Sequence, residues 1–143
     1  MAFKNLNSFM KRIDKRLKVN PSKNAKRAVT RGTLVVSNHA VKSISEGGSG
    51  RIYEKYSPRR SHQASRAGEP PATDTGFLIS QITTNVKQHT DGSVVGQIIS
   101  AAPYSKHLEF GTTQMMARPF MQPALRKNKN KIISIFKKEG VIT

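Results

Sequence analysis

Two runs rich in β-branched and apolar residues stand on either side of a short turn, and this pairing limits the possible folds more than any other feature. The turn is HTDG, residues 89–92, and its Asp91-Gly92 pair is a strong sequence signal for a tight hairpin. We therefore expect an antiparallel hairpin that pairs Phe77–Gln88 with Ser93–Ala101. An antiparallel sheet is thus the expected β component of the fold.

Amphipathic helices are expected before and after this hairpin. Apolar residues recur at three- and four-residue steps over residues 3–18, opposite a face of lysine and arginine, and again over residues 122–138. A second helical stretch runs from about Ser22 to Ile44, although Gly32 and the β-branched residues after it weaken its middle. Helices around a small antiparallel sheet indicate an α+β fold, with the sheet packed against the N-terminal and C-terminal helices.

The length of 143 residues fits one domain, residues 1–143. The absence of cysteine excludes disulfides and thiolate metal sites, so stability must come from packing or from partners. The first residues mix charged and apolar side chains too closely for a signal peptide, and no apolar run approaches membrane-spanning length. We expect a soluble, unprocessed protein.

The middle of the chain carries few structural signals. EGGSG, residues 46–50, predicts a flexible break, and Arg51–Tyr56 alternates apolar and charged residues as a short edge strand does. The next stretch has no periodicity and is dense in proline, glycine, serine and alanine. Because so long a stretch is usually functional or disordered, we expect a flexible, projecting loop over about residues 57–75.

The formal net charge is +17, and the basic residues cluster near both ends of the chain. Such a field favours polyanions or acidic protein surfaces and disfavours close self-association unless acidic neighbours intervene. The face of the expected N-terminal helix holds the candidates for contact with DNA or an acidic partner, namely Lys11, Arg12, Lys15, Arg16 and Lys18. Charge alone therefore predicts a class of partner and no function.

The stretch YSKHLEFGTTQMMARPFMQPAL, residues 104–125, predicts a short helical turn followed by a tight corner. Gly111 can take the positive φ that ends such a turn. Met115 and Met116 suit either a subunit interface or a loop folded back on the core. Glu109 suits either a salt bridge, to Arg118 or to an arginine of a neighbouring copy, or simple solvation.

Further along this stretch, two prolines limit the backbone. Pro119 disfavours helix at Arg118, and Pro123 fits the first turn of the last helix, where no amide donor is needed. Phe120 and Leu125 are expected to anchor that helix in the core.

Nothing in the sequence predicts an enzyme. The four histidines fall in separate segments without ligand-like spacing, and there is no cysteine nucleophile. EGGSG lacks the lysine and the strand-to-helix setting of a phosphate-binding loop. We expect no catalytic residues, no metal site and no cofactor.

Two segments resemble a known family. Residues 104–125 are similar to the signature of the tail-completion proteins in the neck of long-tailed double-stranded DNA phages, in which a tyrosine precedes an LEFGT-like corner, a methionine-containing loop and an ARPF-x-x-PA-L ending. ASRAGEPPATDTGFLISQI, residues 64–82, resembles another block of that family. In chain order we call residues 64–82 the first block and residues 104–125 the second block. The resemblance runs from about Ile44 to Leu125, whereas the N-terminal third matches in helical character only and the basic charge departs from the family.

The resemblance, with the methionine corner, marks candidate contacts with other subunits or partners. In the first block they are Gly68, Glu69, Pro70, Pro71, Asp74 and Thr75. In the second they are Tyr104, Glu109, Phe110, Gly111, Thr112, Met115, Met116, Arg118 and Phe120. Asp74-Thr75-Gly76 also suits a turn into the hairpin, and Thr112 also suits bonding within its own corner.

The resemblance implies a structural virion protein that completes the tail or joins head to tail. It would be assembled in the host cytoplasm as a six-fold ring, with head-closure, tail-terminator or tail-tube proteins as partners and no membrane or small-molecule substrate. The main alternative is a nucleic-acid-binding protein that lays its basic N-terminal helix on phosphates. Aromatic residues make up only 6% of the chain, so a platform for stacking bases is poorly supplied.

Overall fold

The structure is a computed structural model that describes residues 21–142. The chain runs through α2 (Pro21–Ser45), β1 (Ile52–Tyr56), β2 (Arg59–Gln63), α3 (Phe77–Ser80), β3 (Ile82–Gln88), β4 (Val94–Ser100), α4 (Ser105–Phe110) and α5 (Met121–Lys138). The expected α+β fold is confirmed, with helices and two small antiparallel sheets. The helix expected over residues 3–18 lies outside the described residues.

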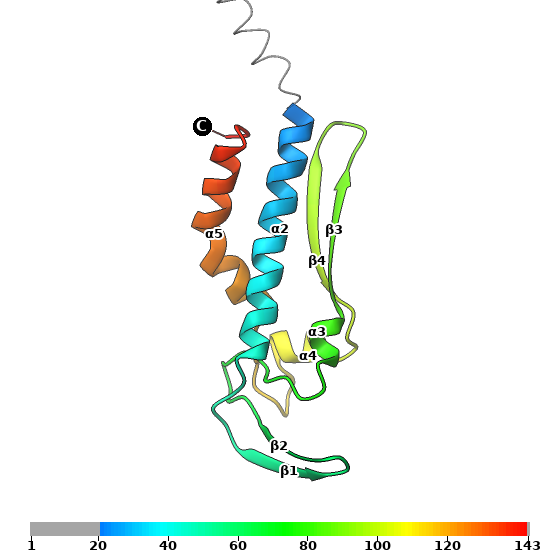
Figure 1. Cartoon of the computed structure of the whole chain (residues 1–143), viewed down its shortest axis with the longest axis vertical. Coiled ribbons are helices and arrows are strands. Elements are labelled where there is room, and N and C mark those ends of the chain that lie inside the picture. Colours follow the sequence, from blue (N-terminus) through cyan, green and yellow to red (C-terminus); the bar gives the residue numbers. More distant parts are fainter. Residues whose placement is uncertain (1–20, 143) are drawn as a thin grey trace, which may run out of the picture.

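Helix α2 is the central element, with α5 on one side and the β3–β4 hairpin on the other (Figure 1). It is continuous through Gly32, where the sequence pattern was weakest. A Cβ atom at Gly32 would stand 3.6 Å from Ile132 and 3.7 Å from Phe136, which is ordinary contact, so α5 packs directly over this part of α2. Packing against two neighbours therefore compensates for a poor local helix propensity.

The core lies where α2 meets α3, α4 and the start of α5. Its buried apolar residues are Val36, Ala40, Ile44, Leu78, Ala102, Phe120 and Ala124. Phe120 is only 1% exposed and anchors α5 as expected. The same expectation for Leu125 was wrong, because this side chain is 55% exposed on the open side of α5.

The predicted hairpin around Asp91-Gly92 is present but shorter at its start. Strands β3 and β4 pair antiparallel from Ile82 with Ser100 to Gln88 with Val94. The first residues of the expected strand form α3 instead, directly after Gly76 with φ 77°. The hydroxyls of Thr73 and Thr75 accept hydrogen bonds from the amides of Gly76 and Phe77, which favours a turn over an extended start.

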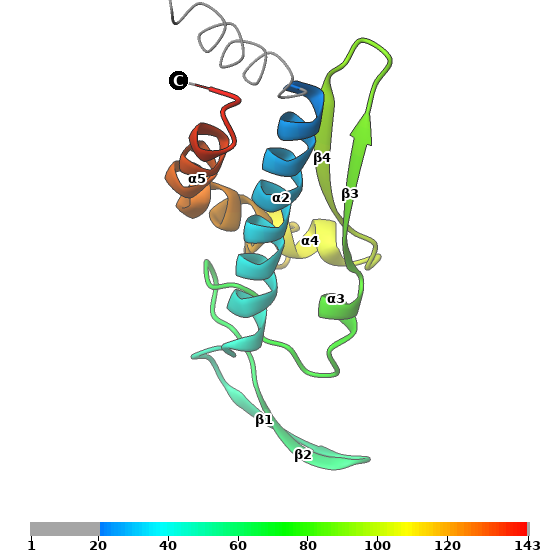
Figure 2. The same ribbon diagram turned by 45° about the horizontal axis from the view of Figure 1, so that its top comes forward.

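A second hairpin projects from the far end of α2 (Figures 1 and 2). The predicted strand at residues 51–56 is confirmed as β1, and its partner β2 falls inside the stretch that we expected to be an irregular loop. The sequence of β2, RRSHQ, has no apolar alternation and thus no strand signal. The remaining loop returns to the body, where the Thr73 amide donates to the carbonyl of Ile44.

Within the described part of the chain, no helix has both the length and the apolar character needed to cross a membrane.

Candidate functional site

The two sequence blocks that carry the family resemblance meet at the end of the molecule below α2. A recess of about 270 Å³ is lined by Pro71, Asp74 and Thr75 from the first block and by Tyr104 and Arg118 from the second. Backbone hydrogen bonds also join the segments, since the Gly68 amide donates to the carbonyl of Ala117 over 2.9 Å. Residues more than 30 positions apart thus form one surface.

Arg118 lines this recess, and one of its hydrogen-bond donors has no partner among the described residues. Its Nε atom is buried and has no hydrogen-bond partner among the described residues, and its Nη1 atom is 4.0 Å from the sulfur of Met115. A guanidinium presents several donors in a fixed fork that suits a carboxylate or phosphate. Arg118 is therefore the strongest candidate in the recess for a contact with an acidic group.

Glu109 does not form the expected salt bridge to Arg118, and its carboxylate is not simply solvated. Its carboxylate accepts hydrogen bonds from the first amides of α5, those of Phe120 (2.9 Å), Met121 (3.0 Å) and Gln122 (2.8 Å). This helix has no acidic residue in its first turn, so its free amides and positive dipole end attract an acid from α4. Glu109 thus caps α5 within its own chain.

The corner after α4 is held together by its own bonds. Gly111 has φ 76°, and a side chain there would meet the carbonyl of Met115 at 2.8 Å. The Thr112 hydroxyl accepts from the amides of Gln114 and Met115, which confirms its role within the corner. The corner therefore has a defined shape rather than the freedom of an ordinary loop.

Large apolar side chains remain exposed around this corner. Phe110 is 75% and Met116 74% exposed, whereas Met115 is half-buried beside Arg118. The rings of Phe77 and Tyr104 are also partly exposed, with centroids 6.2 Å apart. Exposed apolar groups of this size mark interaction sites when they gather on one face.

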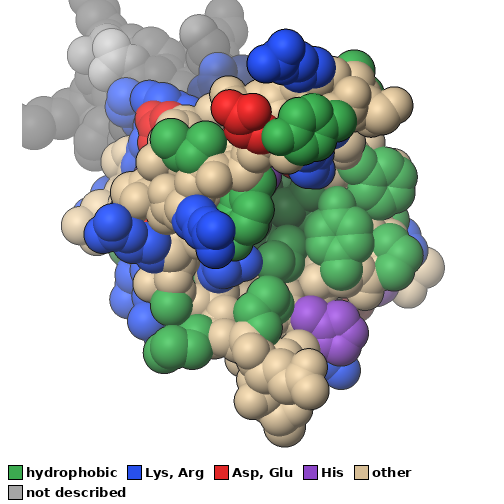
Figure 3. Space-filling view, turned by 90° about the horizontal axis from the view of Figure 1, so that it is seen from below, with side chains coloured by type: hydrophobic (Ala, Val, Ile, Leu, Met, Phe, Trp, Pro, Cys, Tyr) green, Lys and Arg blue, Asp and Glu red, His purple; other side chains and the backbone are tan. Residues whose placement is uncertain are grey.

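Figure 3 looks at this end of the molecule and shows hydrophobic side chains gathered around a hollow, with basic groups beside them. We call Phe77, Tyr104, Phe110, Met116 and Arg118 the end surface: Phe77, Tyr104 and Arg118 line the recess, and the exposed Phe110 and Met116 belong to α4 and to the corner that follows it. Phe120 was expected among the contacts but is buried, so it can act only by holding α5 in place.

The candidate contact residues of the loop mostly make contacts within the fold itself. Glu69 accepts hydrogen bonds from the hydroxyl and amide of Ser49 and from the amide of Arg66. The Ser49 hydroxyl is the main cause that lowers the pKa of Glu69 from 4.5 to about 2, followed by the two amides. Pro71 is buried and Pro70 half-buried, so this part of the loop is held against the break at residues 47–50.

Asp74 ties the projecting hairpin to the body. It forms ion pairs with Lys55 of β1 and, at 3.1 Å, with Arg60 of β2. The Lys55 ammonium is the main cause that holds the pKa of Asp74 below its ordinary value. Sequence reasoning missed Lys55 and Arg60 because nothing in the pattern indicated that these strands pair next to Asp74.

The predicted basic contacts at Lys11, Arg12, Lys15, Arg16 and Lys18 lie outside the described residues. Among residues 21–142, no three histidine or acidic side chains come together as metal ligands would. The described surface offers apolar and guanidinium contacts to another macromolecule.

No protein-family model, curated protein or solved structure matches this chain.

Proposed function

We propose that this chain is a structural virion protein of a tailed phage, which completes the tail or joins head to tail at the neck. It acts through a ring of six copies and through contacts with other neck and tail proteins. The starting point is the resemblance of residues 64–82 and 104–125 to the tail-completion family. The observation that supports it most is that these two segments converge on the end surface, around Arg118.

The molecule has the two unlike surfaces that a ring needs. In a head-to-tail ring, one patch of each copy binds a different patch of the next copy. The end surface is apolar with a guanidinium, whereas the β1–β2 hairpin projects and exposes every residue of β1. We therefore assign the end surface and this hairpin to neighbouring contacts within the assembly.

Charge points to acidic neighbours in addition to copies of the chain. At a net charge of +17, identical subunits repel one another, and acidic head-closure, tail-terminator or tail-tube proteins would offset this repulsion. A carboxylate from such a neighbour would also satisfy the free donors of Arg118.

The direct test is electron microscopy of lysates from a phage that carries an early stop codon in this gene. The proposal predicts filled heads and finished tails that lie unjoined, or particles with malformed necks. Normal, infectious particles would remove the assignment.

Complementation of that phage then tests the surface. Phe110→Ala and Arg118→Ala should abolish joining, because both remove groups from the end surface. Leu34→Ala is the matched control, since Leu34 is an exposed leucine on α2 outside this surface. Equal loss with all three variants would contradict the role of the end surface.

Nucleic-acid binding is the second candidate, supported by the charge of the two long helices. Helix α2 carries five basic residues and α5 carries six, and neither contains an acidic residue. If this surface binds DNA, the logarithm of the affinity should fall linearly with the logarithm of salt concentration. Fluorescence anisotropy should then show weakening when Arg126, Lys127 and Lys129 of α5, or Lys11, Arg12, Lys15 and Arg16 of the N-terminal segment, are replaced by glutamine, and no change for Phe110→Ala.

A further inference from the structure

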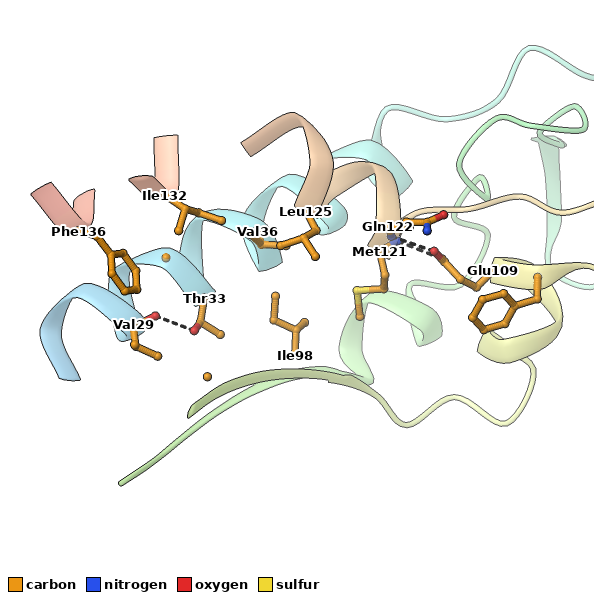
Figure 4. A pocket seen from close by; sticks show the side chains of 13 residues that line it. Val29, Thr33, Val36, Ile98, Glu109, Met121, Gln122, Leu125, Ile132 and Phe136 are labelled. Carbon is orange, nitrogen blue, oxygen red and sulfur yellow. Dashed lines mark hydrogen bonds between the residues drawn. The ribbon is translucent and has the colours of Figure 1, made fainter. Parts of the chain in front are cut away.

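An open apolar groove of about 610 Å³ runs between α5 and β4, with α2 as its floor. Figure 4 shows Val29 and Val36 on the floor, Ile98 on the strand side, and Leu125, Ile132 and Phe136 on the α5 side. Glu109 and Phe110 close one end. The groove is thus a long apolar channel along the central helix.

One glycine explains why the strand wall stands so close to the floor. A side chain at Gly96 would lie 2.3 Å from the hydroxyl of Thr33 and 2.7 Å from Val29, so only glycine lets β4 reach α2 here. No described element fills the space between the two walls, and Leu125 is left 55% exposed.

The chain itself supplies a segment of matching pattern. Apolar residues at helical spacing over residues 3–17 form one stripe, and the basic residues lie opposite to it. They are Phe3, Leu6, Phe9, Met10, Ile13 and Leu17. Docked through that stripe, the segment would cover apolar surface and leave its charges in water.

Length and connection also fit. As a helix, residues 3–17 would extend about 21 Å, and the stretch of α5 that lines the groove, Met121–Phe136, extends about 22 Å. The segment joins α2 at Pro21, about two turns before Val29 at the near end of the groove. Asn20-Pro21 favours a turn at the junction, which allows the chain to fold back.

We propose that residues 3–17 of this chain bind as a helix in the groove between α5 and β4 of the same molecule. Residues 3–17 are joined to α2 by the chain, so their effective concentration at the groove exceeds that of the same segment of a second copy. This inference does not depend on the proposed function. It adds a third helix to the face of α2 that α5 and β4 leave open.

Amide hydrogen exchange of the full chain, followed by NMR, tests the proposal. Residues 3–17 should exchange slowly in the unmodified protein, and Leu125→Asp should speed their exchange tenfold or more by placing a charge in the groove. The matched control is Leu34→Asp, which alters a leucine of similar exposure (46%) outside the groove. It should leave the exchange of residues 3–17 unchanged.

Contacts between methyl groups identify the occupant directly. Nuclear Overhauser effects should join the methyls of Leu6 or Ile13 to those of Leu125 or Ile132 within one molecule. Fast exchange of residues 3–17 in the unmodified protein, or an equal effect of the two aspartate variants, would overturn the proposal. So would methyl contacts that appear only between differently labelled molecules in a mixed sample, since the occupant would then be a second copy.

Discussion

The hairpins β1–β2 and β3–β4 are both two-stranded and antiparallel, but they are stabilised in different ways. Strands β3 and β4 pack along α2, and Ile82 and Ile98 contact the core. Every residue of β1 is exposed, and this hairpin is held by Asp74 with Lys55 and Arg60. An isolated two-stranded hairpin is only marginally stable in water, so each hairpin depends on contacts outside itself. For β3–β4 these contacts are apolar packing, and for β1–β2 they are ion pairs.

The projecting hairpin also has a cation–π contact of its own. Arg51 stacks over the ring of Tyr53 at 5.5 Å from its centroid, on the exposed surface of β1. Exposed cation–π contacts contribute little, on the order of 0.5–1 kcal/mol. We therefore expect the projecting hairpin to open without unfolding the body. Four experiments test the contrast between packed and polar contacts, and the Asp74 variant tests this expectation.

The largest effect should come from Gly96→Val, which attacks the packed hairpin. Its side chain would collide with Thr33 and Val29, so we expect a loss of about 3 kcal/mol in the free energy of unfolding. Urea unfolding followed by circular dichroism measures this loss. Gln97→Ala, the next and exposed position, should change stability by less than about 0.5 kcal/mol. Similar losses for both would show that β4 does not depend on its close approach to α2.

Glu109→Ala should be next, because it removes a polar contact that belongs to the packed body. Three amides of α5 would lose their acceptor, and we expect a loss of about 2 kcal/mol in global stability. Glu109→Gln keeps an acceptor oxygen and should recover part of the loss in the same unfolding measurement. A global stability unchanged by Glu109→Ala would contradict the capping role.

Asp74→Asn should act on the projecting hairpin alone. With the ion pairs to Lys55 and Arg60 weakened, the amides of β1 and β2 should exchange several-fold faster, while those of β3 and β4 keep their rates. Hydrogen exchange resolves the two sets. Faster exchange in both hairpins would show that they form one cooperative unit.

The smallest effect should be the response of Glu69 to acid. Its folded-state pKa is lowered from 4.5 to about 2, so the ionised carboxylate stabilises the fold. That stabilisation is complete above about pH 4.5 and is lost as the pH falls towards 2. The amide signal of Ser49 should therefore titrate near pH 2, and Glu69→Gln should remove the titration. A midpoint near 4.5 would mean that these hydrogen bonds do not favour the charged form.

Elements with an apolar pattern were predictable, and elements held by polar contacts were not. The periodicity of α2 and α5 and the Asp91-Gly92 turn predicted the packed body, and Gly111 ends α4 with the expected positive φ. Strand β2 escaped prediction because its sequence RRSHQ has no buried face. Propensity alone also placed the start of β3 too early, since the threonine turn before Phe77 overrode it.

The candidate site was predictable as residues but not as an arrangement. Arg118 and Tyr104 were recognised through the family resemblance, and the recess that joins them to Asp74 and Thr75 depends on contacts between distant segments. Glu109 was misjudged because a carboxylate eleven residues before Phe120 gives no local sign that it caps α5. The groove beside Leu125 was invisible because a sequence pattern shows an apolar face but not what remains uncovered.

The chain has eight acidic residues, and seven of them lie in residues 21–142. Six of these seven are bound by groups of the chain itself, namely Glu46, Glu69, Asp74, Asp91, Glu109 and Glu139, and their partners are lysine, arginine and serine side chains or backbone amides. With most of its described carboxylates already paired, the protein must recruit mobile anions from the solution to balance the remaining positive charge. A highly charged partner would displace these counterions, and their release would make the entropy of small ions a driving force for assembly.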